Sequence, residues 1–397
     1  MTVVAIISEY NPFHTGHEYH IKKVRETFGT DTAVISIMSG NYTQRGEMAF
    51  LPKGDRAKMA LLGGVDLVLE LPFPYSMSSA ELFATAGVSI ADSIGCVDYL
   101  SFGSESGNIK EIEEAADAFS SKEFEEKFAN TPTSLGYPER CEMAYRAIVP
   151  NGTFTFTSNN ILGIEYIKAI KKLNSKILPH TVKREGASYN SKEPQSIKHQ
   201  SAMAIRNSII KGNEVEEYLP KYSFDIISQA KENGDLPIDS EKLSAAMISY
   251  FRLNPPTENI VFHDAAEGLY NRLYKNSFEA SNISALLELS ETKNYTRARI
   301  RRCMWNSFFG VTSSDVKTLP MYTQVLAINK VGMLLVKNAR KKDGFSILTK
   351  PSDTKNFSKV QLRQKMLSDK ADSVYELAKP VPKSGKSAIK FTPYVEK

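Results

Sequence analysis

The sequence predicts an α/β fold, with a Rossmann-like parallel sheet followed by a mostly helical C-terminal region. Short apolar runs alternate with amphipathic stretches through the first half of the chain, which is typical of parallel strands joined by helices. After about residue 215 such runs become sparse and helical periodicity dominates. The length of 397 residues favours two domains, or one α/β domain with a large helical addition.

Each predicted strand of the first half is a short apolar run bounded by loop residues. The expected strands span residues 3–7, 33–38, 67–71, 99–102 and 177–182. The helices expected between them span residues 17–27, 52–61, 78–92 and 109–119, and another begins near Ser201. Pro52 indicates a helix start, because proline fits the first turn of a helix.

The second half is predicted to be helical as far as a short mixed region. Its helices are expected at residues 240–250, 265–274 and 283–289, with a strand around residues 325–328. From Pro380 onward the chain contains three prolines and several lysines, a composition typical of a loose tail. We therefore divide the chain into a sheet domain over residues 1–214, a mostly helical region over 215–379 and a flexible tail over 380–397.

The composition is that of an ordinary globular protein, with 42% hydrophobic and 24% charged residues and a net charge of +5. This mild positive charge is compatible with a nucleic-acid partner but does not require one. The three cysteines are widely spaced, which argues against a zinc site or a disulfide framework. The apolar run at residues 3–7 is too short for a signal peptide, and no run approaches the ~18 residues of a membrane span, so we expect a cytoplasmic protein.

The loop after the first predicted strand carries the clearest chemical motif, an HxGH arrangement of His14, Gly16 and His17 just before a helix. In an open α/β sheet, ligands bind beyond the carboxyl ends of the strands, so a nucleotide would bind here. Gly16 lets the backbone approach a ligand closely, and the helix N-terminus offers N–H groups to phosphate. The two histidines would then stabilise the charge that develops when the α-phosphorus of ATP is attacked.

Two alternative roles for these histidines stay open, since they could be incidental surface residues or metal ligands on a helix. Their position after the first strand, preceded by Asn11, Pro12 and Phe13, favours the nucleotide loop. A metal site would need a third convergent ligand, so we expect no metal other than the Mg²⁺ that can accompany ATP. A second phosphate element is expected where Ser201 caps a helix that contains Arg206, although a simple capped helix accounts for the same residues.

A cluster of positive charge lies in the helical half, where five cationic residues occupy positions 293–302. If this segment is helical, Arg297 and Arg301 share one stripe, while Ile300 and Met304 indicate the buried side. Phosphate contacts beside an aromatic ring are what RNA docking uses, but a solvated helix face is equally compatible with the pattern. The candidate RNA-binding residues are Lys293, Tyr295, Arg297, Arg299, Arg301 and Arg302.

Six segments make the chain similar to the bacterial tRNA(Met) cytidine acetate ligases, over the stretch from the N-terminus to about residue 310. They are EYNPFHTGH at residues 9–17, SGNYTQRGE at 39–47, DLVLELP at 66–72, SFGSE at 101–105, NNILGIEY at 159–166 and YTRARIRR at 295–302. The resemblance implies an HxGH nucleotidyltransferase fold. It also implies an enzyme that activates acetate with ATP as acetyl-adenylate and then acetylates N4 of the wobble cytidine of elongator tRNA(Met).

On this resemblance, residues 1–214 form the nucleotidyltransferase-like ATP-binding catalytic domain, residues 215–379 bind tRNA, and no tightly bound cofactor is needed. His14 and His17 would be the catalytic residues. The ATP-binding loop would comprise Ile7, Ser8, Glu9, Tyr10, Asn11, Pro12, Phe13, His14, Thr15, Gly16, His17, Glu18, Tyr19 and His20. The further ATP contacts would be Gly103, Asn159 with Asn160 as the alternative, Arg184, Ser201 and Arg206.

Three positions qualify this assignment. Met203 stands where the family pattern has a hydroxyl residue, which leaves one phosphate hydrogen bond without its donor. Gln44 and Arg45 follow the second strand, and we expect them on the acyl or RNA-facing side.

Two other functions stay compatible with the sequence. One is an HxGH adenylyltransferase, or a pantothenate synthetase-like ligase, acting on a small molecule; the other is a non-catalytic RNA-binding protein. The basic segment argues against the first, and the intact HxGH motif argues against the second.

Overall fold

The computed structural model describes residues 1–132, 135–150, 152, 154–185, 200–257, 261–266, 268–293 and 295–396. Its centre is a mostly parallel sheet with the strand order β5-β4-β1-β2-β3-β6-β7, and β8 pairs with β6. The strands are β1 Val3–Ser8, β2 Ala33–Ser39, β3 Leu67–Leu71, β4 Tyr99–Ser104, β5 Leu178–Lys183, β6 Tyr322–Ile328, β7 Ser346–Leu348 and β8 Tyr394–Val395. The predicted α/β class is therefore confirmed, and each predicted strand is present within a few residues.

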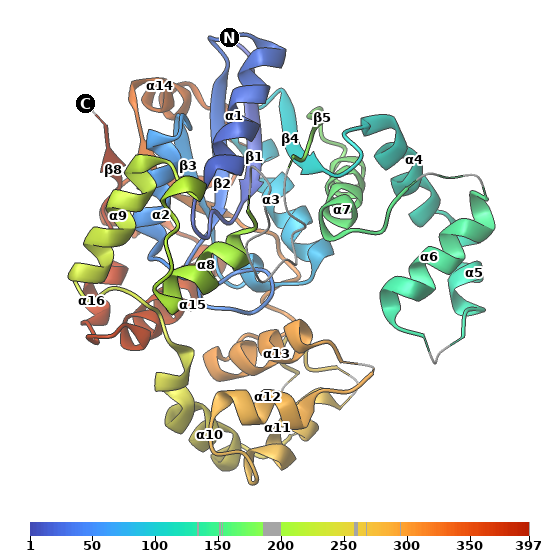
Figure 1. Cartoon of the computed structure of the whole chain (residues 1–397), viewed down its shortest axis with the longest axis vertical. Helices are drawn as coiled ribbons and strands as arrows, with labels where there is room; N and C mark the ends of the chain where they lie inside the picture. The colour runs from blue at the N-terminus through green and yellow to red at the C-terminus, as the bar shows by residue number, and fades with distance from the viewer. Residues whose placement is uncertain are drawn as a thin grey trace.

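Helices cover both faces of the sheet (Figure 1). Residues of β1 alternate between two cores, because Val3, Ala5 and Ile7 face one side while Val4 and Ile6 face the other. The first core receives α3 Ala80–Ile94, α4 Ile109–Phe119, α7 Ser158–Lys172 and α14 Lys330–Asn338. The second core receives α1 Thr15–Phe28, α2 Lys53–Leu62, α8 Ala202–Lys211 and α9 Lys221–Glu232.

A helical subdomain lies beside the carboxyl ends of β2 and β3 (Figure 1). It consists of α10 Ser244–Leu253, α11 Leu269–Ser277, α12 Ile283–Ser290 and α13 Arg297–Phe309. Its core includes Tyr42, just after β2, and Phe73, just after β3, so the loops at the sheet edge are part of its packing. Helices α5 Lys122–Ala129 and α6 Tyr137–Ile148 project from the molecule beyond α4, at the right of Figure 1.

The C-terminal part of the chain differs from the sequence prediction in two ways. The sheet is not confined to residues 1–214, because β6 pairs antiparallel with β3 and extends the sheet on that side. Residues 380–397, expected as a flexible tail, contain α16 Gly385–Ile389 and β8, which pairs with β6. Phe391 and Tyr394 explain this order, since both rings pack against the second core. The long helix α15 Lys359–Tyr375 joins this part to the helical subdomain core.

Candidate active site

A cleft lies at the carboxyl ends of β1 and β4. In the order β3-β2-β1-β4-β5, the chain leaves β1 toward β2 on one side, whereas β4 and β5 lie on the other. The junction of β1 and β4 is therefore the topological switch point, where open α/β sheets bind ligands. Predicted ATP-site residues that line the cleft are Ile7, Ser8, Glu9, Tyr10, Asn11, His14, Gly16, His17, His20, Gly103, Asn159, Arg184 and Arg206.

The first turn of α1 fixes the orientation of both motif histidines. His14 is the N-cap residue, and its Nδ1 accepts a hydrogen bond from the backbone N–H of Gly16 at 3.0 Å. His17 Nδ1 accepts in return from the backbone N–H of His14 at 3.2 Å, which completes a capping box. A neutral imidazole whose Nδ1 accepts must carry its proton on Nε2. The fold therefore sets both histidines as Nε2–H donors.

The charge state of the histidines follows from their surroundings. The His14 and His17 rings stack with centroids 3.8 Å apart. Burial lowers the pKa of His17 well below its usual value, and His14, Arg184 and His20 lower it further. Burial, together with His180 and Arg184, lowers the pKa of His20 to about 3. His17 and His20 are consequently neutral near pH 7, so His17 offers its Nε2–H without carrying a charge of its own.

One wall of the cleft comes from β4, β5 and the start of α7. Gly103 lies near Arg184, whose Cγ would lie 3.2 Å from a Cβ at position 103, so a larger residue would narrow the cleft here. Asn159 Nδ2 donates to Glu105 Oε1 at 2.7 Å, and Arg184 Nε lies 4.0 Å from the same oxygen. Glu105 thus holds two of the predicted ATP contacts side by side.

The two neighbouring asparagines have different roles in the structure. Asn160 is fully buried, where its Oδ1 accepts from the backbone N–H of Glu105 at 3.0 Å and its Nδ2 donates to the Thr155 carbonyl at 2.9 Å. These bonds hold the loop after β4, and Asn160 is not among the cleft-lining residues that the structure describes. Between the two alternatives, Asn159 is therefore the one that lines the cleft.

Helix α8 brings a cation, Arg206, to the lining of the cleft. Ser201 is the N-cap residue and accepts from the backbone N–H of Ala204 at 3.0 Å, so its hydroxyl serves the helix. Arg206 lines the cleft and donates from Nη1 to the Asn11 carbonyl at 2.8 Å. Met203 lines the cleft too and offers no hydroxyl there.

The opposite wall is the loop after β2, which contributes Thr43, Gln44, Arg45 and Glu47. Its backbone is tied to the motif loop, because the Gln44 N–H donates to Glu9 Oε1 at 2.8 Å. Burial raises the pKa of Glu9, although the Gln44 N–H and Arg206 lower it. Gln44 and Arg45 thus line the cleft, and their place on the acyl or RNA-facing side stays a prediction.

Some predicted residues are not among the lining residues of the cleft, and some lining residues were not predicted from the sequence. Among the described residues, those of the predicted set outside the lining are Pro12, Phe13, Thr15, Glu18, Tyr19, Asn160 and Ser201. Lining residues that the sequence did not single out include Glu47, Phe83, Phe102, Leu162, Tyr166, Lys183, Glu185 and Gln200. The aromatic members resemble core positions in sequence, whereas Glu47, Lys183 and Glu185 each lie within two residues of a predicted cleft residue.

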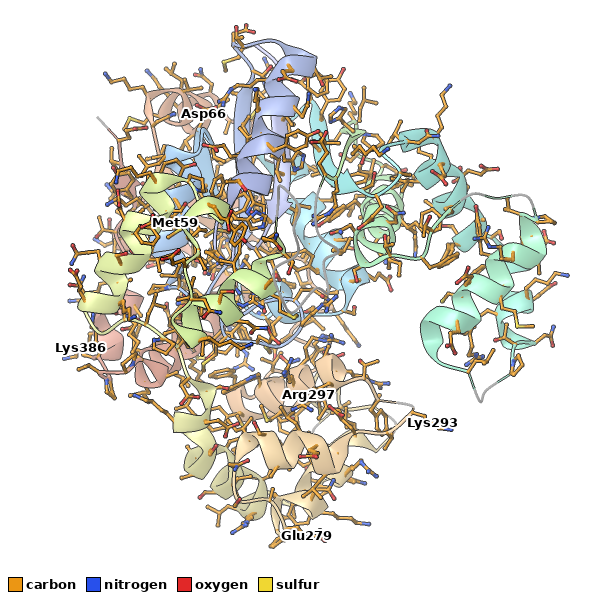
Figure 2. The ribbon with its side chains drawn as sticks, in the orientation of Figure 1. Met59, Asp66, Glu279, Lys293, Arg297 and Lys386 are labelled. Carbon is orange, nitrogen blue, oxygen red and sulfur yellow. The ribbon has the colours of Figure 1, made fainter. Side chains whose placement is uncertain are left out.

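The basic segment forms α13, with Thr296 as its N-cap residue and with Ile300 and Met304 buried as predicted. Its arginines are not equivalent. Arg302 is 8% exposed, and its Nε donates to Asp264 at 2.9 Å, so it does not belong to an exposed RNA-binding face. The other contacts are Arg297 with Glu291 at 2.8 Å, Arg299 over the Tyr295 ring at 5.3 Å, and Arg301 with Glu47 at 2.6 Å. Lys293 is exposed at the rim of the helical subdomain (Figure 2).

A family model described as HIGH Nucleotidyl Transferase matches residues 1–388. Fold and site together therefore define a nucleotidyltransferase of the HIGH class. A Thermoanaerobacter sp. (strain X514) protein named tRNA(Met) cytidine acetate ligase is 36% identical, over 95% of this chain and 96% of that relative. A relative of the same name from Acetivibrio thermocellus is 35% identical over 99% of both chains. The chain belongs to the tRNA(Met) cytidine acetate ligase family, as the sequence resemblance predicted.

Solved structures agree with this assignment over the full length. The crystal structure of Thermotoga maritima TmcAL bound with alpha-thio ATP has a TM-score of 0.88 and 30% sequence identity, and covers 100% of this chain and 99% of that one. The apo form of that protein has a TM-score of 0.90 at the same identity. Among the helices in the described part of this chain, none is long and apolar enough to cross a membrane.

Proposed function

We propose that this protein is an ATP-dependent ligase that activates acetate as acetyl-adenylate and acetylates N4 of the wobble cytidine of elongator tRNA(Met). The observation that carries the proposal is the pair of histidines in the first turn of α1, at the switch point of a chain from this family. They offer two Nε2–H donors beside a helix N-terminus, which suits a triphosphate. We place the reaction in the cytoplasm, where tRNA, ATP and acetate are all available.

The first half-reaction joins acetate to the α-phosphorus of ATP. A carboxylate oxygen of acetate forms the new bond to phosphorus, while the bond to the bridging oxygen breaks and pyrophosphate leaves. His14 and His17 stabilise the developing negative charge, and Arg206 balances charge on the leaving pyrophosphate. Gly103, Asn159 and Arg184 hold the nucleoside side, so acetate approaches from the wall formed by residues 43–47. Positioning and charge stabilisation suffice for this chemistry, which needs no protein nucleophile.

The second half-reaction moves the acetyl group to RNA. The N4 amine of cytidine attacks the acetyl carbonyl carbon, the bond to the AMP phosphate oxygen breaks, and N4 loses a proton. Phosphates of the tRNA are held by Lys293, Arg297, Arg299 and Arg301, and Tyr295 offers a ring for stacking. Helix α13 contacts the loop of residues 43–47 through Arg301, which brings the bound RNA next to the acetyl-bearing wall.

Mg²⁺ would accompany ATP rather than reside in the protein. Within the part of the chain that the structure describes, no group of three or more His, Cys, Asp or Glu side chains could hold a metal ion. The phosphates and water would supply most ligands of such an ion, as Mg²⁺ commonly prefers. Its role would be to neutralise charge on the departing pyrophosphate.

Incubation of the protein with ATP, radiolabelled acetate and total tRNA tests the proposal. We expect label in tRNA, and after nuclease digestion in N4-acetylcytidine, only when ATP is present. Label confined to a small molecule other than acetyl-adenylate would favour the alternative, an HxGH enzyme that acts on a small molecule. Absence of both labelled RNA and pyrophosphate release would favour a non-catalytic RNA-binding protein. Protein with His14→Asn and His17→Asn serves as the negative control.

A further inference from the structure

We propose that Glu47 couples nucleotide binding to tRNA binding, because this carboxylate pairs with one arginine of each site. Its Oε1 lies 2.6 Å from Nη1 of Arg301 on α13, and its Oε2 lies 3.6 Å from Nη2 of Arg206 on α8. We name this arrangement the Glu47 bridge. The inference rests on the proposed function, since it takes Arg206 as a phosphate ligand and Arg301 as an RNA ligand.

The loop that carries Glu47 is held in place from both sides. The N–H and hydroxyl of Thr43 both donate to the Glu47 carbonyl, at 2.9 and 3.1 Å. On the α13 side, Gly46 has a φ of +77°, and a Cβ there would lie 2.7 Å from Arg301 Cβ and 2.9 Å from the Arg302 backbone nitrogen. Only glycine combines that backbone conformation with so close an approach. The loop therefore connects the cleft to α13 directly.

The three side chains of the bridge are shielded enough to interact yet open enough to exchange partners. Their side-chain exposures are 18% for Arg206, 33% for Glu47 and 25% for Arg301. Arg206 and Glu47 both line the cleft, so a bound triphosphate would lie beside them. An anionic ligand at either arginine would compete with Glu47 for that cation.

This competition determines the sign of the coupling. When a triphosphate takes Arg206, Glu47 loses one partner and pairs more fully with Arg301, which makes Arg301 less available to RNA. When an RNA phosphate takes Arg301, Glu47 pairs more fully with Arg206 and weakens its hold on a triphosphate or on pyrophosphate. Binding at one site therefore weakens binding at the other, and linkage makes the two factors equal. The arrangement favours release of pyrophosphate once tRNA arrives, and hence activation before transfer.

The test measures two equilibrium dissociation constants without acetate, so that no reaction occurs. We expect a saturating elongator tRNA(Met) transcript to raise the Kd of α,β-methylene-ATP about two- to fivefold, as a partly exposed ion pair allows. The analogue should raise the Kd of tRNA by the same factor. In Glu47→Gln both ratios should fall to about one. Arg301→Gln removes the bridge from its other end and should have the same effect on the ratio.

The matched control is Glu291→Gln, which removes a carboxylate from Arg297 of the same helix, outside the cleft lining that the structure describes. It should keep the wild-type ratio. If Glu47 had a purely structural role, Glu47→Gln would change the Kd of each ligand but would keep the factor by which the other ligand raises it. A wild-type factor in Glu47→Gln therefore overturns the inference. A wild-type ratio of one, or a ratio showing tighter binding, overturns it as well. If the ATP analogue and tRNA both bind but the coupling is absent or reversed, only this inference fails and the proposed function survives. If neither ligand binds, both proposals fail.

Discussion

At the scale of single residues, His14 has two separable tasks. Its Nδ1 caps α1, and its Nε2–H is the proposed hydrogen-bond donor to the triphosphate in the cleft. Asparagine is a good N-cap residue but is too short to replace the Nε2–H donor. We expect His14→Asn to keep the melting temperature near that of the wild type while acetate-dependent ATP–pyrophosphate exchange falls roughly 100-fold. His14→Ala should lose the same activity and about 1 kcal/mol of stability in addition.

A comparison of the two variants separates the tasks. Exchange at the wild-type rate in a folded His14→Asn protein would show that Nε2 does not stabilise the transition state. Equal melting temperatures for His14→Asn and His14→Ala would show that the cap contributes nothing measurable. His17→Asn should follow His14→Asn, since the two rings stack and both donate from Nε2.

His20 gives the protein a pH-dependent stability. Its pKa in the fold is about 3, lowered by burial, then by His180 and Arg184, whereas an unfolded histidine titrates near 6.5. Below that value the unfolded chain binds a proton that the fold does not, so stability is full above pH 6.5 and declines as pH falls. Between pH 7 and pH 5 this one group accounts for up to about 2 kcal/mol.

The prediction is that His20→Asn narrows the difference between the unfolding free energies at pH 7 and pH 5. Asparagine keeps a polar side chain toward Ser101, the hydroxyl that His20 contacts at 2.8 Å. Urea unfolding at both pH values measures the difference. An unchanged difference in the variant would mean that other groups cause the acid sensitivity.

At the scale of elements, α13 combines structural and RNA-facing arginines. Neutralising Arg297 and Arg299 together should weaken tRNA binding and make its salt dependence shallower by up to about two phosphate contacts. Acetyl-adenylate formation should stay near the wild-type rate, because neither residue lines the cleft that the structure describes. Measured tRNA affinity at two salt concentrations, beside adenylate formation, checks this. Undiminished affinity would remove this part of α13 from the RNA site.

Arg302→Gln is the contrasting variant on the same helix. It leaves Asp264 largely buried without its guanidinium, so we expect a loss of about 3 kcal/mol in unfolding free energy. Its effect on tRNA affinity should be small once the protein is folded. The five-residue cation pattern suggested equivalent roles, and only the fold distinguishes them, because Asp264 lies far from α13 in sequence.

Local patterns predicted the elements better than their partners. The runs at residues 3–7 and 67–71 became β1 and β3, because a strand buried on both faces leaves a continuous apolar signature. The strand around residues 325–328 was also expected, but its antiparallel pairing with β3 is a long-range choice that no local pattern specifies. Similarly, the HxGH motif identified the cleft, whereas Phe83 and Tyr166 have the periodicity of core residues and were not recognised as lining.

At the scale of the whole molecule, a buried ionic cluster joins the N-terminal sheet domain to the C-terminal helix α15. Lys53 of α2 contacts Glu70 of β3 at 2.8 Å and Asp372 of α15 at 2.6 Å, and Asn41 Nδ2 donates to Asp372 at 2.9 Å. All four side chains are nearly inaccessible to solvent. This cluster links α15 directly to α2 and β3 of the sheet domain, although the sequence analysis divided the chain at residue 214.

We expect Lys53→Met to lower the unfolding free energy at pH 7 by about 3–5 kcal/mol, because two buried carboxylates lose their counter-charge while most of the side-chain volume is kept. The loss should shrink as pH falls, since burial raises the pKa of Glu70, Asp372 raises it too, and the substitution removes Lys53, the main influence that lowers it. Lys171→Met, which breaks an exposed pair with Asp117, is the matched control and should cost less than about 1 kcal/mol. Denaturant unfolding of both variants at pH 7 and pH 5 measures these differences. A Lys53→Met loss no larger than that of the control, or one that grows on acidification, would mean that apolar packing around α15, not the charge cluster, holds the chain ends together.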